Sequence, residues 1–175
     1  MRLRLRQFGT IAARRGRHPR GMTSIAWRWL RGLVIALGVL VGFLAIIQVV
    51  PYGRAHSNPR TTGEPVWDSP RTRELASRAC FDCHSNNTRW PWYTHVAPFS
   101  WVVQFDVDSG REVVNFSEWD RHFALAEYAG KRVRSGMMPP YKYRLAHPEA
   151  NLSAAETQEL ARGLDATLAP GEASR

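Results

Sequence analysis

Three residues with the spacing for a specific covalent chemistry stand at Cys80, Cys83 and His84, in the order Cys-x-x-Cys-His. The chain has two cysteines in all, so the pair has to be explained locally. At this spacing both thiols lie on one helical turn, where they can add to the two vinyl groups of a haem, and the adjacent histidine reaches the iron. We therefore predict one covalently bound haem c, with thioether bonds at Cys80 and Cys83 and iron ligation by His84.

Three other uses of the two cysteines are less consistent with the sequence. A thioredoxin-like dithiol needs a βαβ context, which the chain lacks. A zinc site would need four ligands, and adding His84 and His95 to the cysteines gives no common zinc spacing. A disulfide across two intervening residues would close a very small loop and contribute little stability. The motif thus favours haem attachment.

A second axial ligand is predicted in the stretch Gly136-Met137-Met138-Pro139-Pro140. A thioether is a soft ligand, and ligation by one His and one Met raises the reduction potential of a haem iron. Because Pro139 disfavours helical geometry at the residue before it, and the double proline stiffens the loop, we predict Met138 as the ligand in preference to Met137.

Other assignments for this position stay open. Two adjacent methionines also suit an irregular gap in an apolar core. Histidines are common iron ligands, so His95, His122 and His147 are further candidates, although most histidines outside sites are structural or exposed. His122 is the first of these, since we expect it on a helix beside an apolar face.

The elements that position these residues begin with an apolar run of 18 uncharged residues, Leu33–Val50, in which Gln48 is the single polar interruption. A helix of this length spans about 27 Å, close to the roughly 30 Å of a bilayer core. The run is long for a cleaved signal peptide and has no small-x-small site after it, and nothing else in the chain is apolar enough to bury it. We predict an uncleaved transmembrane anchor over residues 32–51, flanked by interfacial aromatic residues at Trp27, Trp29 and Tyr52.

The net charge of +9 is concentrated before this run. Residues 1–31 contain nine arginines and no acid, and the rest of the chain has as many basic as acidic residues. This pattern is typical of membrane topology and not of a nucleic-acid partner. We predict a cytoplasmic basic segment over 1–31 in the inner membrane, with everything after the anchor in the periplasm or its equivalent.

The remaining chain is predicted to be a small all-α domain. Residues 52–68 are rich in Pro, Gly, Ser and Thr and are expected to form an extended linker, and residues 69–170 the domain. A loop is expected over 85–100, and a short helix or extended segment over 101–108. Cap signals and apolar spacing predict helices at Ser69–Ala79, Ser117–Gly136 and Ser153–Leu168.

From Cys80 to about Leu164 the sequence resembles a family of small bacterial haem-binding domains, one branch of the cytochrome c-like proteins. The stretches that carry the resemblance are CFDCHSNNTRWPWY (80–93), VAPFSWVV (96–103), DVDSGREVVNFSEW (106–119), GMMPP (136–140) and YRLAHPEANLSAAE (143–156). The resemblance implies a cytochrome c-like helical fold, haem attached through both cysteines, and Met138 as the distal ligand, because it matches the family's Met-Pro-Pro.

Several neighbours of the haem are also expected. An arginine fork suits the carboxylates of the propionates, and a backbone carbonyl is the usual partner of a proximal histidine ring. The candidates are Trp90, Trp92, Tyr93 and Trp101 for packing, Arg89, Arg111 and Arg144 for the propionates, and the carbonyl of Pro98 for His84.

A haem iron with two protein ligands has no open site for a substrate, so the predicted function is one-electron transfer with redox partner proteins, and not enzymatic catalysis. The alternative is a haem-based sensor or a peroxidase-like enzyme, which needs a displaceable distal ligand. A third class, an interaction domain that uses haem only as core, would predict a fold indifferent to the loss of Met138.

Overall fold

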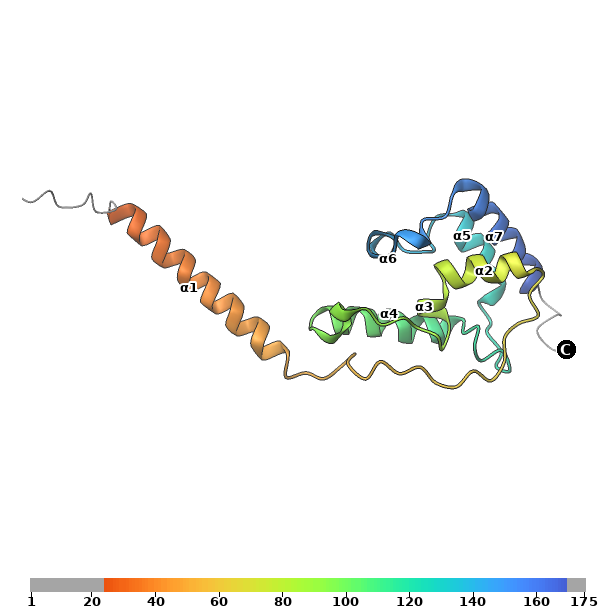
Figure 1. Ribbon diagram of the computed structural model, residues 1–175, viewed down its shortest axis with the longest axis horizontal. Helices are drawn as coiled ribbons and strands as arrows, with labels where there is room; N and C mark the ends of the chain where they lie inside the picture. The colour runs from red at the N-terminus through yellow and green to blue at the C-terminus, as the bar shows by residue number, and fades with distance from the viewer. Residues whose placement is uncertain (1–23, 170–175) are drawn as a thin grey trace, which may run out of the picture. The chain divides into compact units, whose positions relative to one another are not determined.

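The computed structural model describes residues 24–169, and within them the chain is helical with no strand, which confirms the predicted all-α class (Figure 1). Residues 1–23 of the predicted basic segment, and Pro170 at the predicted end of the domain, lie outside the described residues. The chain divides into two compact units, Met1–Phe43 and Leu44–Arg175.

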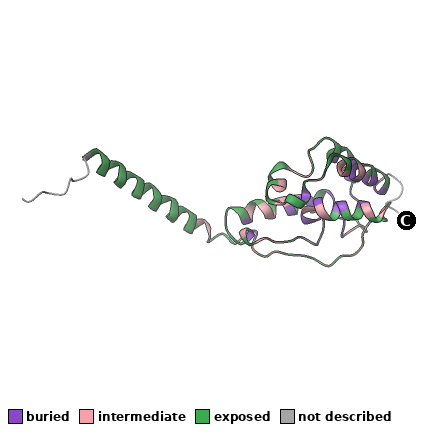
Figure 2. Cartoon of the chain, turned by 45° about the horizontal axis from the view of Figure 1, so that its top comes forward, coloured by how far each residue is buried: buried purple, intermediate pink, exposed green. Residues whose placement is uncertain are grey.

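The helix α1, Ser24–Ile47, supplies the described part of the first unit and enters the second at Leu44. Its stretch Ile25–Ile47 has a mean hydropathy of 2.5, which makes it long and apolar enough to cross a membrane. Its side chains are exposed along nearly the whole helix (Figure 2). A helix that is apolar on all sides and not covered by protein is suited to a lipid environment.

The second unit is built from short helices joined by ordered loops. In chain order these elements are α2 (Pro70–Ala79), α3 (Phe81–His84), η1 (Trp92–His95), α4 (Phe99–Val113), η2 (Ala126–Tyr128), α5 (Ala129–Arg134), α6 (Tyr141–Ala146), η3 (Pro148–Ala150) and α7 (Ala154–Thr167).

The hydrophobic core lies where α2, α5 and α7 pack together (Figures 1 and 2). Leu75 of α2 and Leu160 and Leu164 of α7 are almost completely buried at its centre. Phe81 and Phe116 extend the core toward α3, with ring centroids 5.7 Å apart. Because burial of such side chains is the main driving force for folding, this core fixes the position of α3 and its motif.

Three predicted helix ends are confirmed, two by cap hydrogen bonds and one by its backbone conformation. The Ser69 side chain accepts from the Thr72 N–H at the start of α2, with Pro70 in the first helical position. Ser153 and Glu156 form the complete capping box of α7. Gly136 follows the C-terminal end of α5. Its φ of +71° is the left-handed conformation that glycine adopts readily.

The prediction of one helix over Ser117–Gly136 is wrong in its first half. Residues 117–125 form turns, and the helical part begins at η2. The Ser117 hydroxyl, expected to cap a helix, instead accepts from the Asn86 N–H at 3.0 Å, and the Trp119 N–H donates to the Gly63 carbonyl. These tertiary hydrogen bonds occupy the backbone that a helix would need.

Two other segments are more helical than the sequence predicted. The helix α4 begins at Phe99 and runs to Val113, whereas a loop and a short segment over 101–108 were expected. Many of its residues are β-branched or aromatic and favour helix weakly, but packing against α3 stabilises it. The short helix α6 after Pro139-Pro140 was not predicted at all.

Residues 52–68 have no helix or strand, as expected for a linker, but they are bound along the domain. The Asn58 side chain donates to the Thr88 carbonyl at 2.9 Å, and the Thr62 N–H donates to the Ser117 carbonyl at 2.9 Å. Gly63 forms a parallel bridge with Glu118. The segment belongs to the second unit and does not act as a free tether.

Candidate functional site

The Cys-x-x-Cys-His motif lies at a sharp junction between two helices. Cys80 ends α2, where its N–H donates to the Ala76 carbonyl, and α3 is a single turn that contains Cys83 and His84. The Cys80 carbonyl accepts from the N–H groups of both Cys83 and His84, at 3.2 and 2.9 Å. These bonds close the turn, so the two thiols and the imidazole are held by one short, rigid segment.

Both thiols are free and partly buried. Burial raises the pKa of Cys80 and the pKa of Cys83 to about 12. A dithiol that exchanges disulfides needs a lowered pKa and accessible thiolate, so this environment does not suit a thioredoxin-like role. Among residues 24–169, no group of three or more His, Cys, Asp or Glu side chains converges as a metal site.

The imidazole of His84 is fixed by two backbone carbonyls of α4 and its end. Nδ1 lies 3.0 Å from the Gly110 oxygen and 3.1 Å from the Val114 oxygen, so Nδ1 carries the proton and donates. Nε2 then keeps its lone pair for a metal. Burial lowers the pKa of His84, which keeps the ring neutral. The prediction that the Pro98 carbonyl accepts from the His84 ring is wrong. The C-terminal end of α4 lies at the ring, whereas Pro98 lies at the N-terminal end of this helix.

Gly110 makes this contact possible. A Cβ at this position would collide with the Cys83 backbone carbonyl, so α4 can approach α3 this closely only with glycine. Val107, one turn earlier, is completely buried on the same side of α4. The close crossing of the two helices therefore sets the distance between His84 and its carbonyl partners.

The two methionines of the Met-Met-Pro-Pro stretch have different surroundings. The Met137 sulfur lies 3.1 Å from the Arg132 Nη1, and its residue is 51% exposed. Met138 is 38% exposed, and its side chain has no polar contact within residues 24–169. Of the two thioethers, the one at Met138 thus has no polar partner among these residues, and its ligation of a metal stays a prediction.

Helix α6, which follows this stretch, is bound both to the cysteine motif and to α4. The Tyr143 hydroxyl donates to the Asp82 carboxylate at 2.7 Å, and Asp82 lies between the two cysteines. Lys142 forms an ion pair with Asp106 of α4 at 2.8 Å. Figure 1 shows α6 above α4 in the second unit. These two contacts bring the methionine loop to the same part of the domain as α3 and α4.

Loss of the Tyr143 hydroxyl is therefore expected to loosen α6. Tyr143→Phe removes a hydrogen bond to a buried carboxylate, which should lower the free energy of unfolding by about 1.5–3 kcal/mol. Urea unfolding of the full chain in detergent, followed by circular dichroism, measures this change. Tyr141→Phe is the matched control, because Tyr141 is 69% exposed on the same helix. Equal stability of the two variants would contradict a role for the Tyr143–Asp82 contact.

Large apolar side chains remain exposed on both helices that flank the Lys142–Asp106 pair. They are Val102 and Phe105 on α4, and Tyr141 and Leu145 on α6. The exposed pairs recur at helical spacing, so each helix presents an apolar strip. Contiguous exposed apolar surface is common at ligand-binding and interaction sites, so these strips are candidates for such a surface.

Three buried groups that can donate in the same elements have no partner among the described residues, namely the Ser100 hydroxyl, the Trp101 Nε1 and the Arg144 Nε. A buried donor without a hydrogen bond is costly, so an acceptor at each is expected. Two thiols, a neutral imidazole, a free thioether, apolar strips and unpaired donors together form a set that fits a haem. Arg144 and Trp101 are the side chains that suit its propionates.

The other two arginines considered for the propionates are already engaged. Arg111 donates to the Ser85 and Ser57 carbonyls, and to the side chains of Asn58 and Thr88. Arg89 bridges Asp82 and Glu149. Of the three, Arg144 is the one with a free buried donor.

The aromatic candidates separate as well. Trp90 stacks on His56 with ring centroids 4.7 Å apart, and Trp92 is 79% exposed. The Tyr93 hydroxyl lies 3.1 Å from the His147 Nε2. Trp101 is thus the candidate with a feature that points to the haem.

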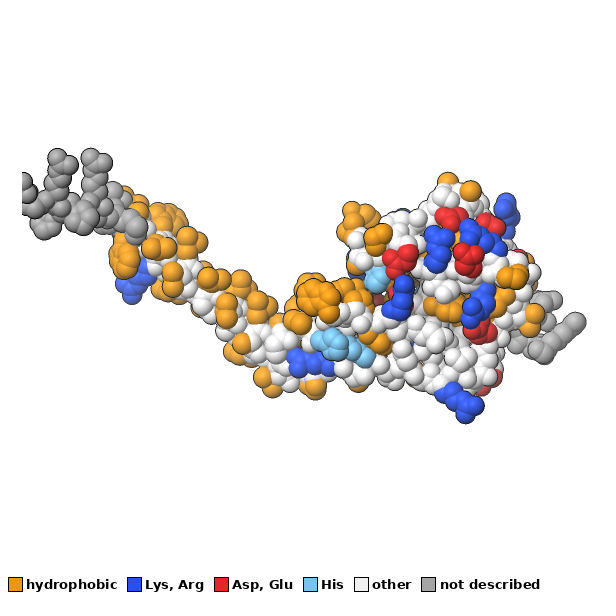
Figure 3. Space-filling model, viewed as in Figure 1, with side chains coloured by type: hydrophobic (Ala, Val, Ile, Leu, Met, Phe, Trp, Pro, Cys, Tyr) orange, Lys and Arg blue, Asp and Glu red, His pale blue; other side chains and the backbone are white. Residues whose placement is uncertain are grey.

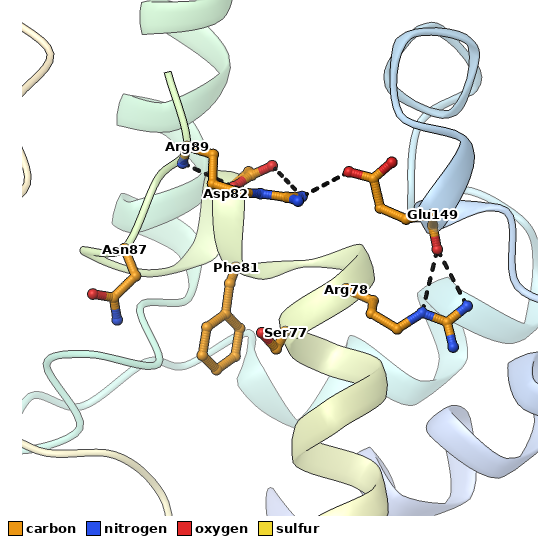
Figure 4. A pocket seen from close by; sticks show the side chains of 7 residues that line it. All are labelled: Ser77, Arg78, Phe81, Asp82, Asn87, Arg89 and Glu149. Carbon is orange, nitrogen blue, oxygen red and sulfur yellow. Dashed lines mark hydrogen bonds and ion pairs between the residues drawn. The ribbon is translucent and has the colours of Figure 1, made fainter. Parts of the chain in front are cut away.

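A pocket of about 310 Å³ lies beside the motif, but it is a different place from the predicted ligand site (Figure 4). Phe81 and Asp82 form one wall, and the Arg89 side chain spans from Asp82 to Glu149 across it. Arg89 pairs with Asp82 and Glu149, and Arg78 pairs with Glu156. Neither cysteine, His84 nor Met138 lines the pocket. These ion pairs therefore join α2 and α3 to α7 and η3.

Several residues that build the site were not found from the sequence. The carbonyls of Gly110 and Val114, the Tyr143–Asp82 bond and the Lys142–Asp106 pair all join segments far apart in the chain. The sequence contained one signal of these contacts, the acidic residue Asp82 between the two cysteines. A carboxylate that is buried there needs a hydrogen-bonding partner from elsewhere in the chain.

Comparison with known proteins gives one match. The model of a family described as a haem-binding domain matches residues 42–166. No curated protein and no solved structure matches the chain.

Proposed function

Because the chain belongs to the haem-binding domain family, we propose that it is a membrane-anchored c-type cytochrome domain that transfers single electrons. In this proposal Cys80 and Cys83 hold one haem c by thioether bonds, and His84 and Met138 are the axial ligands. The haem binding itself follows from the family, whereas the covalent bonds, the ligand pair and the electron transfer are the proposed part.

One observation carries the proposal: the His84 ring donates through Nδ1 to two backbone carbonyls and keeps Nε2 free, one residue from a pair of thiols. This arrangement fixes the tautomer and the orientation of a proximal ligand. A bound haem would supply the iron that accepts and releases one electron. The protein's part is to hold the ligands still, which lowers the cost of changing the charge of the iron.

The alternative function, a haem sensor or a peroxidase-like enzyme, requires a distal ligand that leaves readily. The feature on which it depends is the partial exposure of Met138, which is 38%. We propose the electron-transfer function, because Tyr143 and Lys142 bind α6 on both sides and so restrain the methionine loop. The proposal assigns no catalytic residue.

The proposed location is supported by the apolar helix and the arginine pattern. We propose that α1 crosses the inner membrane with the basic segment in the cytoplasm and the second unit in the periplasm. Covalent haem attachment takes place outside the cytoplasm, so this orientation is consistent with the proposed thioether bonds.

Absorption spectra of the full chain purified from membranes test the function. We expect a low-spin ferric spectrum with the weak red charge-transfer band of Met-ligated haem, and a reversible one-electron titration. A high-spin ferric spectrum that shifts on addition of cyanide would instead indicate the sensor or peroxidase-like function. Haem that extracts into acidified organic solvent would contradict covalent attachment.

A further inference from the structure

The single polar residue of the apolar run, Gln48, has a specific structural role at the start of the second unit. Its side-chain Nε2 donates to the Ala97 carbonyl at 2.9 Å, and its Oε1 accepts from the Ala97 N–H at 3.0 Å. The amide of one side chain thus pairs with both polar groups of one residue, as in a short stretch of sheet. Gln48 directly follows Ile47, the last residue of the candidate membrane span.

Two further contacts make this junction rigid. The Arg54 Nη2 donates to the backbone carbonyl and to the Oε1 of Gln48, at 2.6 and 3.0 Å. Gly53 has φ of +77° and is buried so closely on α4 that a Cβ would collide with the Ser100 carbonyl. Within the second unit, the chain is therefore bound to α4 within six residues of Gln48.

Ala97 lies between apolar residues that the domain leaves exposed. Val96 precedes it, and Phe99, two residues after it, is 59% exposed. Tyr93 joins Phe99 to Trp92, with ring centroids 6.4 and 6.1 Å apart, and Trp92 is 79% exposed. We name Trp92, Val96 and Phe99 the juxtamembrane patch. Figure 3 shows hydrophobic side chains gathered beside histidines on the surface of the second unit.

The charges near this patch suit a phospholipid surface. No acidic residue occurs before Glu64, and none occurs from His84 to Phe105, the stretch that contains the patch. Arg54, His56 and His95 are basic groups of these two segments, and Tyr93 contacts the patch itself. One acidic residue of α4, Asp108, faces the first segment, where it accepts from the Tyr52 hydroxyl at 3.1 Å. Anionic headgroups attract basic residues near a membrane, and tryptophan is enriched at the level of the headgroups.

We propose that the juxtamembrane patch rests on the lipid headgroup layer of the membrane that α1 crosses, and that Gln48 holds it there. The polar layer on each side of a bilayer core is about 5–8 Å thick. Ala97 is joined to Gln48 by hydrogen bonds of a single side chain. When α1 spans the bilayer core, Ala97 therefore lies within or next to the headgroup layer. The domain then exchanges electrons at the membrane surface, with membrane-embedded partners, and does not shuttle. This inference rests on the membrane-spanning part of the proposed function.

Photo-crosslinking of the full haem-containing chain in vesicles of phosphatidylethanolamine and phosphatidylglycerol tests the inference. We expect Trp92→p-benzoylphenylalanine and Phe99→p-benzoylphenylalanine to give lipid adducts by mass spectrometry. Val66→p-benzoylphenylalanine is the matched control, because Val66 is an apolar residue that is 80% exposed elsewhere on the unit. Adduct yields at 92 and 99 no higher than at 66, or adducts to a second copy of the chain instead of lipid, would overturn the proposal.

A second variant tests Gln48 itself. Gln48→Leu keeps the apolar run intact but removes both bonds to Ala97, so the lipid adduct at position 92 should fall several-fold while the haem spectrum stays unchanged. An undiminished adduct would show that Gln48 does not hold the patch. Carbonate extraction separates the two failures: a chain released from the vesicles refutes the membrane span, whereas a retained chain without adducts refutes only the docking of the domain.

Discussion

The double variant Cys80→Ala, Cys83→Ala is expected to lose all haem that stays on the polypeptide after denaturing electrophoresis. Both thioether bonds of the proposed attachment are removed, whereas His84 keeps its two backbone partners, because these bonds do not involve the thiols. Both positions should also accommodate alanine, because it is smaller than cysteine and a good helix former. In-gel haem staining measures the result directly.

The single variants supply the internal control for this experiment. Each keeps one thiol, so Cys80→Ala and Cys83→Ala should each retain a reduced amount of covalent haem. The double variant still has His84 and Met138, so any haem that it binds should extract into acidified organic solvent. Covalent haem that persists in the double variant would refute the attachment at this motif.

The local elements of this fold could be predicted from the sequence where a short segment contains its own determinants. The Ser69-Pro70 start of α2 and the capping box at Ser153 each need residues within three positions of one another, and both are present. The Cys-x-x-Cys-His turn is equally local. The family match agrees with the resemblance that these stretches carry.

The secondary-structure predictions that were wrong concern segments whose conformation depends on residues far away in the sequence. Ser117 has the composition of a helix cap, but the Asn86 N–H and the Thr62 N–H take its side chain and its carbonyl, so the backbone turns instead. The helix α4 was underestimated for the same reason, since its stability depends on the close approach of Gly110 to α3. Intrinsic propensity is a weak guide where tertiary contacts of this kind compete with it.

The candidate site shows the same division. Its proposed ligands lie in two short motifs and could be suggested from residue type and local sequence. The groups that orient them could not, because the His84 partners lie 26 and 30 residues further along the chain. The composition of residues 52–68 indicated an extended linker, whereas Asn58, Thr62 and Gly63 bind this segment to loops that composition does not reveal. The proposed ligands were thus easier to suggest from the sequence than the residues that orient them.

The variant Met138→Leu is expected to keep covalent haem but to lose the methionine charge-transfer band. Leucine has a similar volume and no atom that binds iron, so the core is little disturbed and the ligand alone is removed. Because ligation by Met raises the potential of a haem iron, the midpoint potential should fall by on the order of a hundred millivolts, within the roughly 0.8 V range that axial ligands span. Spectroelectrochemical titration measures both changes.

Met137→Leu is the adjacent control for this prediction. Its sulfur contacts the Arg132 guanidinium, and its residue is the more exposed of the two, so the band and the potential should stay as in the natural chain. Loss of the band in Met137→Leu, with Met138→Leu unaffected, would exchange the two assignments. If neither variant changed the spectrum, a histidine would have to be the ligand. His147 would then need to give up its contacts with Tyr93 and Glu149, which lie 3.1 and 3.4 Å away, whereas Met138 has no such contact to lose.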